Sequence, residues 1–232
     1  MYAYMNEIEV TSLWIYVVFM FSGAAVFALW SMNRKGVPKV EYLIAFFIPV
    51  WSGLAYMSMA MGQGGIVKDG GVVYFARYLD WVVTTPLLLI ALALTGMHHL
   101  KKKDPIIIAS LIAADVVMIT TGFIADMSTG GVVFTWYLIG ITAFLVILWL
   151  IWSPLRKLAK QQGEKLYKVY LMVCGYLTLF WVGYPLVWLL GPSGLGVIGQ
   201  AGDTLLFVIL PIFSKVGFSL LDLYQLRRLR IG

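Results

Sequence analysis

The sequence predicts an all-α membrane protein: a bundle of seven transmembrane helices with a small β-hairpin between the second and third. Hydrophobic residues make up 61% of the 232 positions and charged residues 12%, whereas soluble domains carry about 25% charged residues. Seven segments are apolar over the roughly 20 residues that a bilayer crossing requires. Basic residues gather in the connections on one side. We therefore expect one seven-helix domain over residues 1–232, embedded as a multi-pass protein in the cell membrane.

The expected spans follow one another with short connections, so neighbours in sequence should pack as antiparallel neighbours in space. They cover residues 12–32, 41–62, 74–97, 105–125, 131–153, 166–191 and 201–225. Most of the 17 Lys and Arg residues fall in the first, third and fifth connections and after the last span, Arg230 included. Lys68 falls on the opposite side. The positive-inside rule then predicts an outer N-terminus and a cytoplasmic C-terminus.

Other features of the chain narrow the class of protein. The connection from Gly62 to Gly71 is glycine-rich, and β-branched residues flank Lys68-Asp69, which predicts the hairpin. Acidic residues precede the first apolar run, so no cleavable signal peptide is expected. Basic residues in short loops do not form the basic face of a nucleic-acid-binding domain. The sequence has no metal-ligand spacing, phosphate loop or nucleophile motif, and the single Cys174 is expected to be a small core residue.

Lys215 is the most informative residue, because it lies within the apolar run from Phe207 to Phe218. A lone ammonium at that depth costs about 2.5 to 3.5 kcal/mol on insertion scales. Such a lysine is either paired with an acid or converted into something other than a free amine, such as a Schiff base to an aldehyde cofactor.

The third span carries Arg77, Asp80 and Thr84 on one helix face, because spacings of three and four residues stack. Two interpretations are open. Arg77 and Asp80 can form a structural ion pair, or Asp80 can be the counterion of a protonated Schiff base at Lys215. The depth of Lys215 and its need for an anion favour the second interpretation.

Further polar residues lie in or near the spans. Asp222 follows Lys215 by two helical turns, about 10 Å toward the cytoplasm, and its apolar neighbours predict a carboxyl able to hold a proton; alternatively it pairs with Arg227 or Arg228. Asp203 is expected to be a solvated acid at a helix start, although it can belong to a proton path. We expect Asp115 to form a hydrogen bond between helices, and we expect His98 and His99 to be exposed to solvent.

The sixth span carries an aromatic stripe at helical spacing, formed by Trp181, Tyr184 and Trp188. Such a stripe is usually core or interfacial belt. If it faces the same interior as Trp81 and Lys215, it forms a flat apolar slot for a conjugated ligand. Pro185 removes one backbone hydrogen bond there, which permits a kink.

Together these residues resemble the microbial (type 1) rhodopsins over nearly the whole chain. The motifs are Arg77-Tyr78-Leu79-Asp80-Trp81 with Thr84-Thr85-Pro86, Trp181 with Tyr184-Pro185 and Trp188, and Ser214-Lys215-Val216-Gly217-Phe218. The resemblance implies all-trans retinal bound as a Schiff base to Lys215, with Asp80 as counterion and Arg77 outside it. By the same match, the residues around retinal would be Tyr56, near the counterion, and Trp81, Thr84, Thr85, Met118, Gly122, Trp181, Tyr184, Trp188 and Pro211.

The chain departs from the outward proton pumps of that family at three places. Pro211 stands where those pumps have a second aspartate, and Ala91 stands where they have a cytoplasmic proton donor. Ser193 replaces one of two extracellular release glutamates, and the other falls at Asp203. The combination of Asp80 with Thr84 and Ala91 also differs from the chloride and sodium pumps.

Pro211, the segment Phe46–Tyr56 and the segment Phe218–Leu223 are similar to the xenorhodopsin group, which includes cyanobacterial sensory rhodopsins and light-driven inward proton pumps. The resemblance implies an inward pump: the proton leaves Lys215 toward the cytoplasm. The residues placed on its path are Asp222 and Glu41 on the inner side, and Asp80, Arg77, Tyr56 and Asp203 on the outer side, from which the proton is replaced.

Two other functions are open. The first is a photosensor that signals to a soluble cytoplasmic transducer, and the short tail past Asp222 predicts that no output domain is fused to the chain. The second is a seven-helix receptor or chaperone without photochemistry, which would be expected to lack the lysine. Family likeness also implies a homo-oligomer in the lipid bilayer, commonly a trimer.

Overall fold

The computed structural model describes residues 5–68 and 71–229. Within them, seven helical spans are long and apolar enough to cross a membrane, as predicted. The fifth and seventh spans each join two α-helices through a π-helical turn. The helices are α1 Glu7–Met32, α2 Lys39–Ala60, α3 Phe75–Gly96, α4 Pro105–Met127, α5 Val132–Leu150, η1 Ile151–Leu155, α6 Arg156–Gln161, α7 Glu164–Leu190, α8 Gln200–Pro211, η2 Ile212–Gly217 and α9 Phe218–Leu229.

Helix α1 begins five residues earlier than the apolar pattern indicated, because its start is set by capping. The Asn6 side chain accepts a hydrogen bond from the Glu9 backbone N–H, and the Glu9 carboxylate accepts one from Asn6 N. This reciprocal capping box satisfies N–H groups that the first helical turn leaves free. Asp104 caps α4 without a reciprocal bond: its carboxylate accepts from the backbone N–H groups of Ile106 and Ile107, and Pro105 is at the first helical position.

The predicted hairpin is present between α2 and α3. Strand β1 Ile66–Lys68 pairs antiparallel with β2 Gly71–Val73, with Ile66 opposite Val73 and Val67 opposite Val72. The turn residues Asp69 and Gly70 lie outside the described residues, as does Arg230 in the basic tail. The Gln200 amide at the start of α8 bonds the Val72 backbone, which ties the hairpin to the last span.

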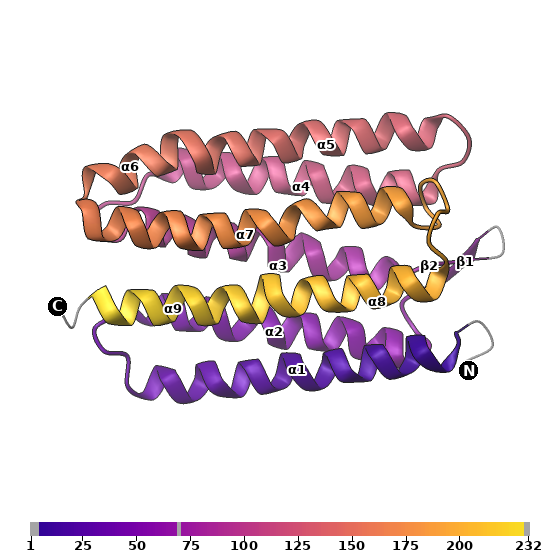
Figure 1. The fold of residues 1–232 in the computed structure, drawn as a ribbon, viewed down its shortest axis with the longest axis horizontal. Coiled ribbons are helices and arrows are strands. Elements are labelled where there is room, and N and C mark those ends of the chain that lie inside the picture. The colour runs from indigo at the N-terminus through magenta and orange to yellow at the C-terminus, as the bar shows by residue number, and fades with distance from the viewer. Residues whose placement is uncertain (1–4, 69–70, 230–232) are drawn as a thin grey trace.

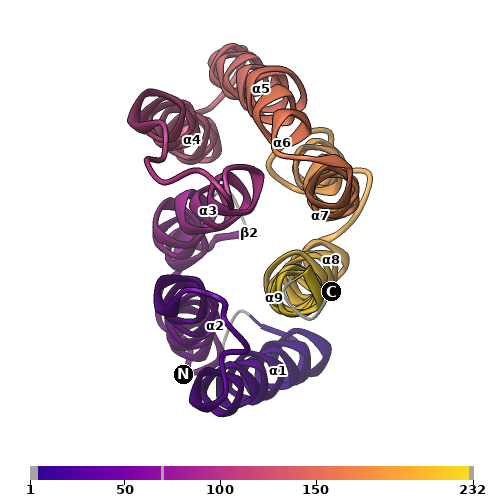
Figure 2. The same ribbon diagram turned by 90° about the vertical axis from the view of Figure 1, so that its left-hand side faces the viewer.

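The spans form a ring when the bundle is viewed from one end (Figure 2). Helices α1 to α4 follow one another along one side, and α5, α7 and the α8–α9 span return along the other to meet α1. The hairpin lies at the same end as the N-terminus, and the C-terminus lies at the opposite end (Figure 1). We call the hairpin end the outer end and the end with the basic connections the inner end, as the positive-inside rule predicts.

Candidate functional site

Lys215 lies inside the ring with its side chain buried, and its exposure is 1%. Its ammonium forms an ion pair with the Asp80 carboxylate from α3. Lys215 Nζ also donates a 2.9 Å hydrogen bond to Ser52 Oγ on α2. On the other carboxylate oxygen, Asp80 accepts a 3.1 Å hydrogen bond from Thr84 Oγ1. The structure therefore brings together the lysine and the acid proposed as its counterion, and Thr84 serves the carboxylate rather than a ligand cavity.

Ser52 and Tyr16 belong to this network but were not identified from the sequence. Ser52 Oγ donates to Asp80 Oδ2 at 2.9 Å and lies 2.6 Å from the Tyr16 hydroxyl. A serine hydroxyl has one proton and two lone pairs, so Tyr16 is the donor to Ser52. The Tyr16 ring stacks on Tyr56, with ring centroids 3.9 Å apart. The available signal was a lone hydroxyl in the apolar Phe46–Tyr56 segment, which gives no partner by itself.

The backbone around Lys215 departs from an α-helix. Residues 212–217 form a π-helical turn directly after Pro211. Proline has no N–H to continue the α-helical ladder, and single π turns inside α-helices commonly mark functional positions. Pro211 is buried in this span but is not part of the cavity described below. Its contribution to the site is the backbone that presents Lys215.

Arg77 pairs with Asp203, which rules out the alternative of an Arg77–Asp80 ion pair and corrects the expectation for Asp203. Arg77 Nη1 donates a 3.1 Å hydrogen bond to Asp203 Oδ2, and the guanidinium lies over the Phe207 ring at 4.2 Å from its centroid. Asp203 is buried and is therefore not the solvated acid that was expected. In the first turn of α8, its carboxylate faces Arg77 of α3 inside the ring and not the surrounding solvent. Tyr56 lies on this outer side, where its hydroxyl donates to Phe207 O at 2.8 Å.

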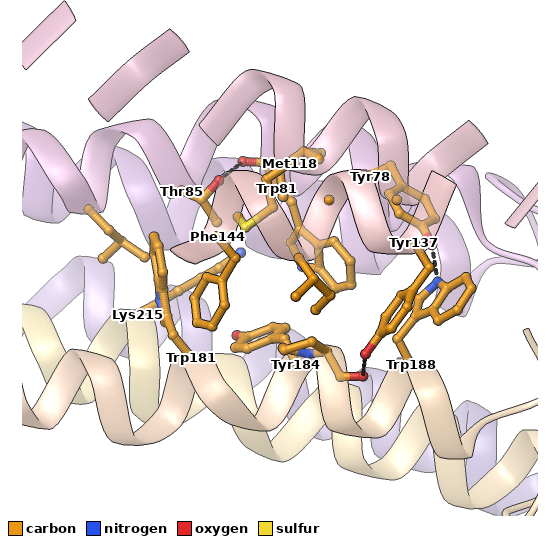
Figure 3. Close-up of a pocket in the computed structure, with 16 residues that line it drawn as sticks. Tyr78, Trp81, Thr85, Met118, Tyr137, Phe144, Trp181, Tyr184, Trp188 and Lys215 are labelled. Atoms are coloured by element: carbon orange, nitrogen blue, oxygen red, sulfur yellow. Dashed lines mark hydrogen bonds between the residues drawn. The ribbon is translucent and has the colours of Figure 1, made fainter. Parts of the chain in front are cut away.

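An apolar cavity extends from Lys215 between α3, α4, α5 and α7 (Figure 3). Seven residues of the expected retinal set line it, whereas Tyr56, Thr84 and Pro211 do not. The seven are Trp81, Thr85, Met118, Gly122, Trp181, Tyr184 and Trp188. The Trp81 and Tyr184 rings meet edge to face at 5.5 Å.

Eight further lining residues were missed from the sequence: Tyr78, Leu88, Ile119, Tyr137, Gly140, Ile141, Phe144 and Pro185. Several belong to α5, where cavity-facing and lipid-facing residues are equally apolar and hydropathy does not separate them. Tyr137 Oη donates to the Pro185 carbonyl at 3.0 Å, which supports the backbone of α7 at its proline. A slot of apolar and aromatic side chains that ends at a buried lysine fits a conjugated aldehyde attached at Lys215 Nζ.

On the inner side of Lys215, Asp222 is 3% exposed and accepts a 2.7 Å hydrogen bond from Thr95 Oγ1 on α3. The suggested pairing of Asp222 with a terminal arginine is wrong. Arg227 Nη1 donates to the Trp30 carbonyl and to the Tyr42 hydroxyl, and Arg228 approaches Tyr224. The physical reason is that Asp222 faces into the bundle, where Thr95 already meets its carboxylate.

Glu41 is also buried at the inner end, where Asp222 and Lys103 lie close enough to interact with it electrostatically. Its Oε2 atom has no hydrogen-bond partner within residues 5–68 and 71–229. Lys103 Nζ donates to three backbone carbonyls at the end of α3, those of Met97, His98 and Leu100. Partial burial lowers the pKa of the Lys103 ammonium, although the nearby Glu41 carboxylate opposes that shift.

Three remaining sequence expectations have clear outcomes. Asp115 is hydrogen-bonded between helices as expected, with Thr85 Oγ1 donating to Asp115 Oδ2 at 2.7 Å. Cys174 is buried in the core as expected. The expectation for His98 is wrong, because it is 8% exposed, whereas His99 is exposed. In the described part of the chain, no group of three His, Cys, Asp or Glu side chains could hold a metal ion.

Seven membrane-spanning helices around a buried lysine and an aromatic cavity define a membrane protein built to hold a conjugated chromophore. Comparison with known families agrees, because residues 7–229 match the family of bacteriorhodopsin-like proteins. The chain belongs to this family of light-driven proton pumps and related microbial rhodopsins. It binds retinal as a Schiff base to Lys215 and is a multi-pass membrane protein.

Individual relatives show how far the similarity extends. Archaerhodopsin-3 of Halorubrum sodomense is 34% identical over 195 residues, which cover 82% of this chain and 73% of the relative. The thermophilic rhodopsin of Rubrobacter xylanophilus superposes with a TM-score of 0.89 at 34% identity, over 97% of this chain and 100% of that chain. The light-driven proton pump of Coccomyxa subellipsoidea superposes with a TM-score of 0.87 at 29% identity, over 95% and 97%.

Proposed function

We propose that this protein is a light-driven inward proton pump of the xenorhodopsin kind. The observation that carries the proposal is the buried carboxyl of Asp222 on the inner side of Lys215. Seven residues separate the two along one continuous span, which corresponds to about 10 Å. Thr95 Oγ1 orients the carboxyl inside the ring, and the buried Glu41 carboxyl lies close enough to interact with it electrostatically. A carboxyl in this position is suited to receive a proton released toward the inner end.

The charges around Lys215 Nζ support release in that direction. Asp80 forms the ion pair with Lys215, and Pro211 adds no second carboxylate in the preceding turn. Retinal, when bound, absorbs light and isomerises, which reorients the N–H bond at Lys215 Nζ. In the proposed cycle the Nζ proton then moves to the Asp222 carboxylate, and Asp80 first takes up a proton from the outer side and then passes it to Nζ as the replacement. Ala91, on the inner half of α3, has no proton to donate, so the inner side of this scheme only accepts protons.

The direct test is the sign of the light-induced pH change. Cells that express the chain and are supplied with retinal are illuminated in weakly buffered medium. Inward pumping should make the medium alkaline, and a protonophore should abolish the change. Acidification of the medium would overturn the proposal in favour of outward pumping. Light-induced absorbance changes without any pH change would also overturn it, in favour of a photosensor.

Two substitutions at the inner end separate the proposed path from general effects of charge. Asp222→Asn should stop or strongly slow the pH change, because the amide cannot take a proton. Asp104→Asn removes a carboxylate at the same end of the bundle but keeps an equally good helix cap. It should therefore pump normally. Normal pumping by the Asp222→Asn variant would exclude Asp222 as the acceptor.

A further inference from the structure

A second, polar cavity lies at the outer end of the bundle, and the Arg77–Asp203 pair forms part of its lining. Its charged lining residues are Lys68 from the hairpin, Arg77 from α3, Asp126 from α4 and Asp203 from α8. Arg77 is committed to Asp203 through Nη1, and its Nε and Nη2 atoms have no hydrogen-bond partner among the described residues. A cavity lined by charged side chains and wide enough for water offers the polar partners that ordered water needs. We therefore treat this cavity as a hydrated site.

Asp126 is the acid in this cavity for which the pumping scheme above has no role. It is 8% exposed, and its Oδ2 atom accepts a 2.9 Å hydrogen bond from Tyr78 Oη. Its Oδ1 atom is buried and has no partner within the described residues. Lys68 Nζ does not bind this carboxylate and instead donates to the backbone carbonyls of Asp126 and Ser128, at 2.9 and 2.5 Å.

The hydrogen-bond directions around Tyr78 follow from the chemistry of its partners. Trp188 Nε1 can only donate, so Tyr78 Oη accepts from it at 3.1 Å, and the single Tyr78 proton goes to Asp126 Oδ2. Oδ2 is therefore an acceptor, and a proton on Asp126 must be at Oδ1, the atom without a partner. Tyr78 and Trp188 also line the retinal cavity, where Figure 3 shows their contact. The chain Trp188–Tyr78–Asp126 thus connects the two cavities.

We propose that Asp126 holds a proton in the outer cavity and exchanges it, at Oδ1, with the outer medium. Changes in the retinal cavity trigger this exchange, and Trp188 and Tyr78 transmit them to Asp126. Oδ1 is buried in this structure, so its proton reaches cavity water when Trp188 and Tyr78 shift, and Asp203 remains the partner of Arg77. This role is independent of the pumping direction, because either direction moves a proton through the outer end.

The alternative is that Asp126 only accepts the hydrogen bond of Tyr78. The amide oxygen of an asparagine would fill that structural role equally well. Asp115 provides a matched control on the same helix. It is also buried, with one oxygen accepting from a hydroxyl and Oδ1 without a partner in residues 5–68 and 71–229, but it does not line the outer cavity. A difference between Asp126 and Asp115 variants therefore reports on the cavity and not on burial.

The test uses the full chain with retinal in lipid nanodiscs, and light-minus-dark infrared spectra recorded in H₂O and D₂O. A carboxylic C=O band that shifts in D₂O should be present in the unmodified protein and in Asp115→Asn, and missing in Asp126→Asn. Asp126→Glu should retain the band at a shifted frequency. Tyr78→Phe should move the band without abolishing it, because the donor to Oδ2 is lost.

A second measurement reads proton exchange at the outer surface with a pH-sensitive dye confined to that side of vesicles. Asp126→Asn should slow this exchange by about 100-fold, the lower end of the range expected for loss of a positioned proton carrier, and Asp126→Glu should restore it. Identical infrared bands and exchange rates in the unmodified protein and the Asp126→Asn variant would overturn the proposal, even if that variant were less stable. The sign of the pH change in cells is read separately, so failure of inward pumping would leave this result intact.

Discussion

Arg77 Nη1 donates a 3.1 Å hydrogen bond to Asp203 across the bundle, although Asp80 lies one helical turn away on its own helix. The consequence is that, in the described part of the chain, the interior holds two separate ion pairs, Lys215 with Asp80 and Arg77 with Asp203. Asp80 is left free to balance the charge at Lys215 Nζ. The outer pair lines the outer cavity, and it fixes the last span against α3.

Replacing Asp203 by asparagine should destabilise the protein strongly, because Arg77 keeps its charge in a buried position without a counterion. Loss of one partner of a buried ion pair costs about 3 to 5 kcal/mol. The control is Glu164→Gln, which removes an exposed i,i+4 pair with Lys168 and should cost less than about 0.5 kcal/mol. Thermal denaturation in detergent, followed by the visible band, compares the two. Equal midpoints would contradict this account of the Arg77–Asp203 pair.

Ser52→Ala should affect both the stability and the visible spectrum, because Ser52 Oγ connects Lys215, Asp80 and Tyr16. Attachment of retinal leaves Nζ with one proton, for which Ser52 and Asp80 are competing acceptors. Without the hydroxyl, that proton is committed to Asp80, so the absorption maximum should move. The buried Tyr16 hydroxyl loses its acceptor, which costs about 1 to 3 kcal/mol.

The double substitution Tyr16→Phe with Ser52→Ala isolates that stranded hydroxyl. It should be more stable than Ser52→Ala alone, because no unsatisfied donor remains. Ser31→Ala removes an exposed hydroxyl that bonds its own helix and should change neither property. A double variant that is less stable than Ser52→Ala would show that Tyr16 contributes through its other contacts, such as the stack on Tyr56.

Lys103 should give the protein a pH-dependent stability at alkaline pH. Its pKa is lowered in the folded state by partial burial, so between that lowered value and the ordinary lysine value the unfolded chain binds more protons. Stability therefore rises with pH across this window and is lowest below both values. The side chain is only partly buried, so we expect an effect of about a few tenths of a kcal/mol.

The measurement for Lys103 compares unfolding at several pH values from neutral to alkaline. Lys103→Met should lose part of the rise in stability that the unmodified chain shows. Lys101→Met, at an exposed position in the same connection, should keep the full rise and corrects for the other titrating lysines. A steeper rise in Lys103→Met than in the control would mean that the three carbonyls at the end of α3 hold the charged form more strongly than burial disfavours it.

Much of the fold could be predicted because a bilayer imposes simple rules on sequence. Apolar length locates the spans, and glycine with β-branched residues locates the hairpin. The pairing of Lys215 with Asp80 was also accessible, because a cation at that depth requires an anion. What local sequence does not contain is the choice among distant partners. Arg77 and Asp203 are more than 120 residues apart, and helix rotation decides whether Arg77 meets its helix neighbour or the far span.

The same limit explains the residues that were missed at the site. In α5, the residues that line the retinal cavity and those that face lipid have the same polarity, so hydropathy does not distinguish them. The sequence does not mark Ser52 or Asp126, because the importance of each depends on its hydrogen-bond partners. Ser52 Oγ has three partners, whereas the Asp126 carboxyl has a partner at Oδ2 and none at Oδ1 among the described residues. That information requires the packed structure.

Thr95→Val should slow light-driven proton movement without changing the shape of the inner end. The substitution keeps the branched side chain but removes the hydroxyl that donates the 2.7 Å hydrogen bond to Asp222. A hydrogen bond to a charged group is worth about 1.5 to 3 kcal/mol, and each 1.4 kcal/mol corresponds to a factor of about ten. If Asp222 receives the proton, losing the donor that stabilises its ionised form and fixes its orientation should lower the initial rate of the pH change by about tenfold.

The matched control is Thr142→Val, because Thr142 is exposed on α5 and bonds only its own helix in the described contacts. The initial rates of the two variants are compared after normalisation to their visible absorbance. If both variants transport protons equally fast, the inner path does not depend on the Thr95–Asp222 contact.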